Sequence, residues 1–239
     1  MRFVGWAVLA LTLGGMLGCT KQEAELERAP GDEKLILATT LGSAPYSYRD
    51  EATGEIVGID IEIARAAAKR MNRELEIRPM AFSQLLPAVK SGEVDFAAAA
   101  ITITPSRARD VDFTEPYAYD GSAFLYRTGA PRPTVSRGNV MRVGTQTTSS
   151  SQFYLSDHGI DSISYNEYDD ALEDFEKGLI DAVFYDAEPI RQTVAKSEGR
   201  YAVTPLFTRE NYGLAVRKDF PELREALDAV IRERKEAAK

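Results

Sequence analysis

VDFAAAAITITPSRARDVDF, from Val94 to Phe113, is the stretch that decides the fold. A short apolar run gives way to Thr102, Thr104 and Arg107 within a few positions, as expected where a buried strand ends in a polar tip. The planar guanidinium of Arg107 can bind a carboxylate through two hydrogen bonds, and Thr102 offers a hydroxyl beside it. The segment therefore predicts a carboxylate-binding site at a strand end. The alternative is a surface arginine in a loop.

The residues before this stretch alternate between strand and helix patterns. Lys34 to Thr39 and Leu75 to Met80 have the composition of strands. Asp60 can cap a helix between these two strands, and Ser83 can cap a helix after the second strand, which Gly92 can end. The order strand, helix, strand, helix, strand predicts a parallel sheet covered on both faces.

A second unit of the same kind follows. Strands are expected at 141–144, 162–165 and 181–185, with helices before and after the last of them. The two units share a phrase, Gly92-Glu-Val-Asp95 in the first and Gly178-Leu-Ile-Asp181 in the second, each between a helix and a strand. This weak internal symmetry predicts two lobes of similar architecture.

Asp186 directly follows the last strand of the second unit, as Thr102 and Arg107 follow the corresponding strand of the first. Ligands of open parallel sheets bind beyond the carboxyl ends of the strands. If the lobes face each other, a carboxylate-binding arginine and a cation-binding carboxylate meet across one cleft, which would suit a zwitterion. The alternative for Asp186 is a helix N-cap before Ala187.

The N-terminus has the layout of a secretory signal peptide: Arg2, an apolar run from Phe3 to Leu13, and small residues before Cys19. Met16-Leu17-Gly18-Cys19 resembles a bacterial lipobox, so residues 1–18 are expected to be a lipoprotein signal peptide and Cys19 the lipidated, membrane-anchored mature N-terminus. Residues 20–32 are charged and poor in large apolar side chains, which predicts a flexible tether. The protein is therefore expected outside the cytoplasm.

Composition excludes several classes of function. The chain carries 29 basic and 37 acidic residues, a formal net charge of −8, so nothing favours binding to nucleic acid. One His and one Cys cannot supply a His/Cys zinc site, a disulfide framework or a Cys-His nucleophile pair. No metal or cofactor is expected, and His158 is interpreted as a solvated loop residue.

Four phrases resemble the bacterial extracellular solute-binding proteins of family 3, which deliver polar amino acids to ABC importers. They are APYSYRD from Ala44, IVGIDIEIARAAAKR from Ile56, FSQLLPAVKSGEVDFAAAAITITPSRARDVDFTEPY from Phe82, and DAVFYD, which ends at Asp186. The third phrase is the most specific.

The resemblance implies an α/β protein with two Rossmann-like lobes joined by two crossing strands, a periplasmic binding protein type II-like fold. The first lobe is expected to comprise residues 33–119 and 211–239, and the second residues 120–210. The chain has one C-terminal helix after the resemblance ends and lacks the aromatic-rich segment of many relatives, so the first lobe is expected to be completed differently.

The resemblance also implies roles for single residues. Arg107 would hold the ligand α-carboxylate and Asp186 the α-ammonium, while Thr102 and the backbone of Ala100 would line the α-carbon end. Phe82 would pack on the ligand side chain, and Thr148 would support the carboxylate near a helix start.

Departures from the family pattern concern the side-chain end of the ligand. Thr40 stands where many relatives have Asp, and Ser43 stands where they have an aromatic residue; both positions contact the ligand side chain in the family. Loss of the acid at Thr40 weakens the case for a basic ligand. Gly144, at a variable specificity position, offers no side chain, and Gln146 replaces the usual Gly before the threonines.

The predicted function is capture of an amino acid by closure of the cleft and delivery to an ABC transporter permease, by a monomer. One alternative is an enzyme on the same scaffold, resembling periplasmic cyclohexadienyl dehydratases, with Asp186 or Glu188 as general acid. Another is a lipoprotein that senses its ligand for a partner receptor.

Overall fold

The structure is a computed structural model that describes residues 34–137 and 140–238. The expected signal peptide, the lipidated Cys19 and the tether at 20–32 all lie outside these residues. Within them, no helix is both long enough and apolar enough to cross a membrane.

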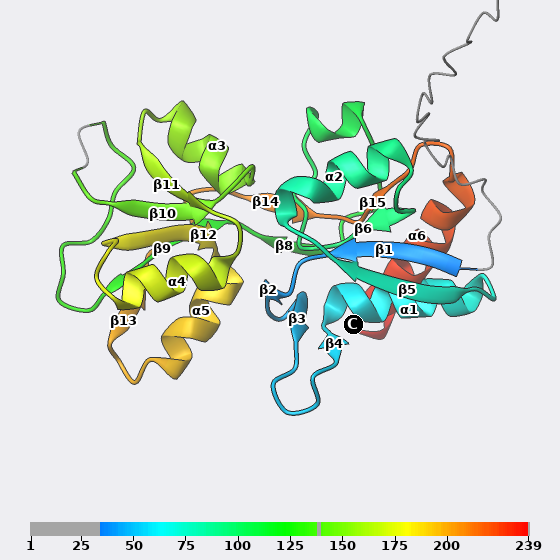
Figure 1. Ribbon diagram of the computed structural model, residues 1–239, viewed down its shortest axis with the longest axis horizontal. Helices are drawn as coiled ribbons and strands as arrows, with labels where there is room; N and C mark the ends of the chain where they lie inside the picture. Colours follow the sequence, from blue (N-terminus) through cyan, green and yellow to red (C-terminus); the bar gives the residue numbers. More distant parts are fainter. Residues whose placement is uncertain (1–33, 138–139, 239) are drawn as a thin grey trace, which may run out of the picture.

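The first lobe is built on a five-stranded sheet with strand order β5-β1-β6-β15-β7 (Figure 1). Its strands are β1 (Lys34–Thr39), β5 (Glu74–Pro79), β6 (Phe96–Ala97), β7 (Asp112–Phe113) and β15 (Ala215–Val216). β1 pairs in parallel with β5 and β6, whereas β15 runs antiparallel to β6 and β7. Three strands are therefore the parallel unit that the sequence predicts, and a late segment of the chain extends their sheet.

Helices cover both faces of this sheet. They are α1 (Ile59–Arg70), α2 (Phe82–Ser91) and α6 (Pro221–Ala237). α1 and α6 share one apolar cluster with alternate residues of β1, including Leu35, Leu37 and Leu227, while α2 packs on the other face against Ile36 and Ala38. The C-terminal helix thus completes the core of the first lobe.

The second lobe repeats the arrangement with strand order β11-β10-β12-β9-β13. Its strands are β9 (Ser122–Arg127), β10 (Val143–Gln146), β11 (Ser162–Tyr165), β12 (Ala182–Asp186) and β13 (Tyr201–Val203), and its helices are α3 (Ser150–Asp157), α4 (Tyr168–Glu176) and α5 (Ala187–Lys196). β10 is parallel to β11 and β12, and β9 is antiparallel to β12. The predicted similarity of the two lobes is confirmed by this shared order.

Two short antiparallel strands, β8 (Ala118–Asp120) and β14 (Glu210–Tyr212), run between the lobes (Figure 1). A small separate sheet lies on the first-lobe side: β2 (Gly42–Ser43), β3 (Ser47–Arg49) and β4 (Ile56–Val57). The predicted fold class, two α/β lobes joined by two crossing strands, is confirmed.

The starts of the first two helices differ from the prediction. α1 begins at Ile59 with Gly58 as its N-cap, and α2 begins at Phe82 with Ala81 as its N-cap. Gly58 has φ +123° and its Cα lies against the Tyr46 carbonyl, where a Cβ would come within 2.1 Å of the oxygen. Because the helix starts earlier than Asp60, the carboxylate of Asp60 lies inside the first turn and faces the interior instead of capping the helix.

Candidate ligand-binding site

Arg107 opens a short 3-10 helix, η1 (Arg107–Arg109), in the loop between β6 and β7. Its Nη1 donates to the Thr102 carbonyl at 2.9 Å, and its Nη2 donates to the Thr148 carbonyl of the other lobe at 3.2 Å. The guanidinium also lies 5.5 Å from the centre of the Phe82 ring. These contacts hold Arg107 in the cleft, which argues against a free surface arginine.

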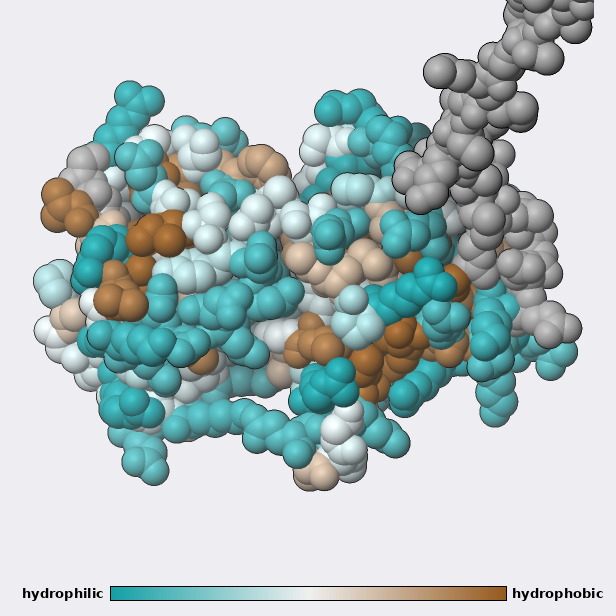
Figure 2. All heavy atoms as spheres, viewed as in Figure 1, coloured by the Kyte–Doolittle hydropathy of each residue, from teal (hydrophilic) through white to brown (hydrophobic). Residues whose placement is uncertain are grey.

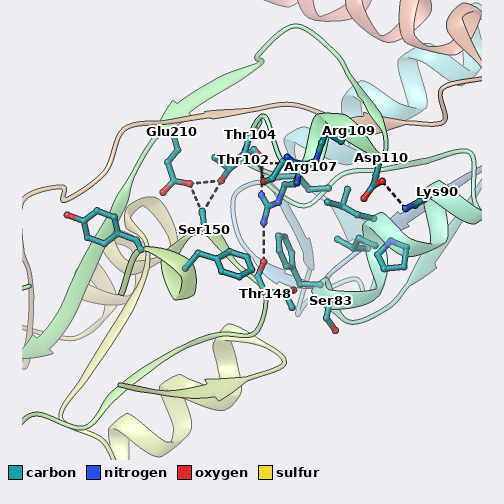
Figure 3. Close-up of a pocket in the computed structure, with 18 of the residues that line it drawn as sticks. Ser83, Lys90, Thr102, Thr104, Arg107, Arg109, Asp110, Thr148, Ser150 and Glu210 are labelled. Carbon is teal, nitrogen blue, oxygen red and sulfur yellow. Dashed lines mark hydrogen bonds and ion pairs between the residues drawn. The ribbon is translucent and has the colours of Figure 1, made fainter. Parts of the chain in front are cut away.

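Four of the predicted site residues, Phe82, Thr102, Arg107 and Thr148, line one cavity of about 870 Å³ between the lobes. Figure 3 shows Arg107 reaching from η1 to the Thr148 carbonyl, and Figure 2 shows the surface notched between the lobes on the side of α2 and α3. Thr148 has φ +59°, and its amide donates to the Gln152 side chain at 2.7 Å. That amide, expected to support a ligand carboxylate, therefore has an internal acceptor.

Asp186 ends β12 at the start of α5, but its carboxylate makes no N-cap hydrogen bond. Asp120 from β8 accepts from the Glu188 amide instead, at 2.7 Å, and also pairs with Arg191. Asp186 is therefore the N-cap residue of α5 by position, as the alternative expected, but its side chain does not cap the helix. Burial and the nearby charges of Glu210 and Asp120 raise the pKa of Asp186 well above its usual range.

Arg107 and Asp186 lie close enough for their charges to interact. Burial lowers the pKa of Arg107, while the negative charges of Glu210 and Asp186 oppose this effect. Arg107 in turn lowers the pKa of Asp186, although less than its acidic neighbours raise it. The two lobes thus bring a cation and a carboxyl group to the same cleft, as the sequence predicts, although Asp186 does not line the 870 Å³ cavity.

Ala100 lies buried in the loop after β6 with φ +48°, and its amide donates to the Asp60 carboxylate at 3.2 Å. The Ala100 backbone, which was expected to line the α-carbon end of the ligand, is therefore fixed by a hydrogen bond from its amide to Asp60. Burial raises the pKa of Asp60 to about 6, against the lowering effects of the nearby Tyr117 hydroxyl and of the hydrogen bond from the Ala100 amide.

Thr40 and Ser43 lie away from the large cavity. Thr40 lines a second cavity of about 520 Å³ together with Gly42 and Arg49 of the first lobe and Glu167 and Asp169 of the second. The Ser43 hydroxyl instead lies 3.1 Å from the Tyr185 hydroxyl, across the cleft. Burial, with Asp170 and Asp169 nearby, raises the pKa of Glu167 to about 7.

Residues that sequence reasoning missed surround the acidic side of the cleft. The Tyr46 ring makes edge contacts with Tyr212 at 5.5 Å and with Tyr117 at 6.3 Å. Burial, then the charges of Asp120 and Asp186, raise the pKa of Tyr46, so its hydroxyl stays protonated. Tyr46 lies within the phrase APYSYRD, but the family resemblance implied no role for this residue.

Glu210, at the start of β14, was also missed. It is buried, and one oxygen of its carboxylate accepts hydrogen bonds from Thr102 and Ser150 (Figure 3). The other oxygen accepts hydrogen bonds from Ser122 and Thr208. Among residues 34–137 and 140–238, no group of three or more His, Cys, Asp or Glu side chains is arranged to hold a metal ion.

Residues 35–239 match the bacterial extracellular solute-binding proteins, family 3. The chain belongs to this family. The resemblance that the motifs indicated is confirmed, and the extracellular character of the family agrees with the location expected from the N-terminus.

Relatives of this solute-binding protein include an arginine-binding and a histidine-binding protein. It is 30% identical to a putative ABC transporter arginine-binding protein 2 of Escherichia coli (strain K12), over 85% of this chain and 86% of that protein. It is 28% identical to the histidine-binding periplasmic protein of Salmonella typhimurium, over 94% of this chain and 90% of that protein. The arginine-bound form of truncated ArgBP from T. maritima has a similar structure, with a TM-score of 0.78 and 28% identity over 84% of this chain and 96% of that one.

Proposed function

We propose that this solute-binding protein captures an α-amino acid between its lobes and delivers it to the permease of an ABC importer. The observation that carries the proposal is the placement of Arg107 and Asp186 at equivalent strand ends of facing lobes, with interacting charges. The names of the relatives, an ABC transporter arginine-binding protein and a histidine-binding periplasmic protein, support the same ligand class.

In the proposed complex, Arg107 binds the α-carboxylate and Asp186 the α-ammonium. Charge-assisted hydrogen bonds of this kind contribute roughly 1.5 to 3 kcal/mol each, so the ligand supplies the free energy that favours closure. A ligand carboxylate would replace the Thr148 carbonyl as the acceptor of Arg107 Nη2. An ammonium beside Asp186 would relieve the repulsion from Glu210 and Asp120 that now raises its pKa.

The side-chain end of the ligand is proposed to lie toward Thr40 and Ser43. Thr40 carries no charge, but Glu167 and Asp169 line the same cavity from the other lobe. These carboxylates restore an acidic environment on this side of the cleft, which places arginine and histidine first in a ligand screen.

The anchor is part of the proposal. Met16-Leu17-Gly18-Cys19 has the spacing of a lipidation site, and a lipid on Cys19 would hold the protein at a bacterial membrane outside the cytoplasm. Mass spectrometry of the mature N-terminus should find a diacylglycerol-modified Cys19. Cleavage elsewhere, with an unmodified terminus, would contradict the anchor but not the ligand site.

We further propose that the protein is a monomer and that it binds its ligand without catalysing a reaction. Glu188, one candidate general acid, pairs with Arg191 at 2.8 Å. Incubation with prephenate or arogenate should yield no aromatic product; its formation would establish the dehydratase instead. Loss of amino-acid uptake on deletion of the gene for this protein would support delivery to a permease, whereas unchanged uptake would favour sensing.

The central test is calorimetry with the amino acids selected by a thermal-shift screen. Arg107→Ala should lose affinity by at least roughly a hundredfold, because two charge-assisted hydrogen bonds are removed. The control variant Arg65→Ala removes an arginine from the exposed face of α1 and should bind the amino acid as tightly as the wild type does. Unchanged affinity in Arg107→Ala would overturn the assignment of the carboxylate site.

A further inference from the structure

Glu210 is a buried carboxylate at the junction of three parts of the protein. It belongs to the crossing strand β14, whose residues pair with β8. Its Oε2 accepts from Thr102 of the first lobe at 2.5 Å and from Ser150 of the second lobe at 2.7 Å. One carboxylate oxygen therefore bonds both lobes at once.

The other oxygen anchors Glu210 to the second lobe alone. Oε1 accepts from Thr208 at 2.6 Å and from Ser122 at 2.9 Å, and Thr208 in turn accepts from the Ser122 amide. Because these partners are fixed to β9 and to the segment before β14, they do not depend on how far the cleft is open.

The contact between Thr102 and Ser150 does depend on the cleft. Their hydroxyl oxygens lie 3.1 Å apart across the interlobe gap, beside the Arg107 hydrogen bond to Thr148 (Figure 3). Because Glu210 and Ser150 are both held by the second lobe, a rotation about β8 and β14 that parts the lobes moves Thr102 away from Oε2 and from Ser150. The network on this oxygen is therefore complete only in the closed arrangement.

We propose that Glu210 is a positioning residue that latches the two lobes through Thr102 and Ser150 and so couples occupation of the carboxylate site to closure. Each hydroxyl has a single proton, and Thr102 directs its proton at Glu210. Thr102 then presents lone pairs to the cleft, which suits the α-ammonium of the ligand better than its carboxylate. This last step rests on the proposed function; the latch does not.

The test combines Ser150→Ala, Glu210→Gln and the matched control Ser122→Ala. Ser150→Ala removes the hydroxyl that faces Thr102 across the gap together with its bond to Glu210, whereas Ser122→Ala removes a partner of the same carboxylate that does not face the first lobe. Small-angle X-ray scattering of the unliganded proteins measures closure, and calorimetry measures affinity for the amino acid that the screen selects. Circular dichroism establishes that each variant folds.

Ser150→Ala and Glu210→Gln should show a larger radius of gyration without ligand, or an affinity reduced roughly tenfold, since a hydrogen bond to a charged group is lost in the closed form. Ser122→Ala should match the wild type in both measurements. The latch is overturned if neither quantity changes in Ser150→Ala, or if Ser122→Ala changes as much. If no amino acid binds the wild type, the proposed function fails while scattering still decides the latch.

Discussion

The two lobes have the same order of parallel strands, but they differ in the segment that follows the third strand, β6 in the first lobe and β12 in the second. In both, an aspartate just before that strand accepts a backbone amide of the neighbouring strand region: Asp95 from Ile36 at 2.8 Å and Asp181 from Arg142 at 2.9 Å. After β6 the chain makes the long loop that carries Arg107, whereas β12 passes directly into α5 at Asp186. The repeated contact preserves the sheet, and the differing exits supply opposite charges to the cleft.

The largest expected difference between the lobes concerns the two aspartates before these strands. The Asp95 side chain is 9% exposed and lies 3.7 Å from the buried Arg217, while the Asp181 side chain, paired with Arg142, is 37% exposed. Asp95→Ala should lower the free energy of unfolding by about 3 kcal/mol, because it leaves the Ile36 amide without its charged acceptor and leaves Arg217 with Asp219 as its remaining carboxylate neighbour in these contacts. Asp181→Ala should cost about 1 kcal/mol. Urea denaturation of both variants measures the contrast, and equal losses would show that burial does not distinguish the lobes.

A second difference lies at the second residue of equivalent helices, where α1 has the buried Asp60 and α3 the buried Ser151. The folded-state pKa of Asp60, about 6, exceeds its ordinary 3.8, so the folded protein loses stability as pH rises from about 4 to 6. The free energy of unfolding of Asp60→Asn, relative to that of the wild type, should therefore be higher at pH 7.5 than at pH 4, by on the order of 3 kcal/mol.

Chemical denaturation at both pH values checks this change in the free energy of unfolding. Ser151→Ala is the matched control at the equivalent helix position and should show no such pH dependence. A constant difference between wild type and Asp60→Asn from pH 4 to 7.5 would contradict the titration of Asp60.

The smallest expected effect arises at the next pair of equivalent helices. The first turn of α4 carries Asp169 and Asp170 after Glu167, whereas the first turn of α2 has no acid. Since the folded-state pKa of Glu167 is about 7, stability should fall as pH rises from about 4.5 to 7. Because Glu167 is partly exposed, the effect should stay under about 1 kcal/mol. Glu167→Gln should remove part of the decline in the melting temperature between pH 6 and 7.5; Glu173→Gln, on the exposed face of α4, should not.

The sequence predicted the two lobes, because strand and helix patterns alternate twice along the chain. It also predicted that Arg107 and Asp186 follow apolar strands, while their roles in binding a ligand stay predictions. The N-cap positions were less predictable. Asp60 has the residue type of a cap, but the unusual φ of Gly58 starts the helix one residue before it. Asp186 stands at the cap position, yet Asp120 from a distant strand binds the Glu188 amide.

Glu210 had no local signal at all. Three of its partners, Thr102, Ser122 and Ser150, are 108, 88 and 60 residues away in the chain. Its importance depends on how the lobes meet, which neither periodicity nor capping patterns encode. The internal acceptors of the Ala100 and Thr148 amides were unpredictable for the same reason, since each depends on side-chain geometry in the folded loop.

The crossing strands also divide the first lobe between the two ends of the chain. The sheet of the second lobe comes from one continuous stretch, from β9 to β13, whereas the first lobe needs β15 and α6 from the end of the chain. A chain that emerges N-terminus first can therefore complete its second lobe while the apolar face of α1 still lacks Leu223, Leu227 and Ile231 of α6. The lobe that carries Arg107 therefore begins first and is completed last, when α6 docks on its core.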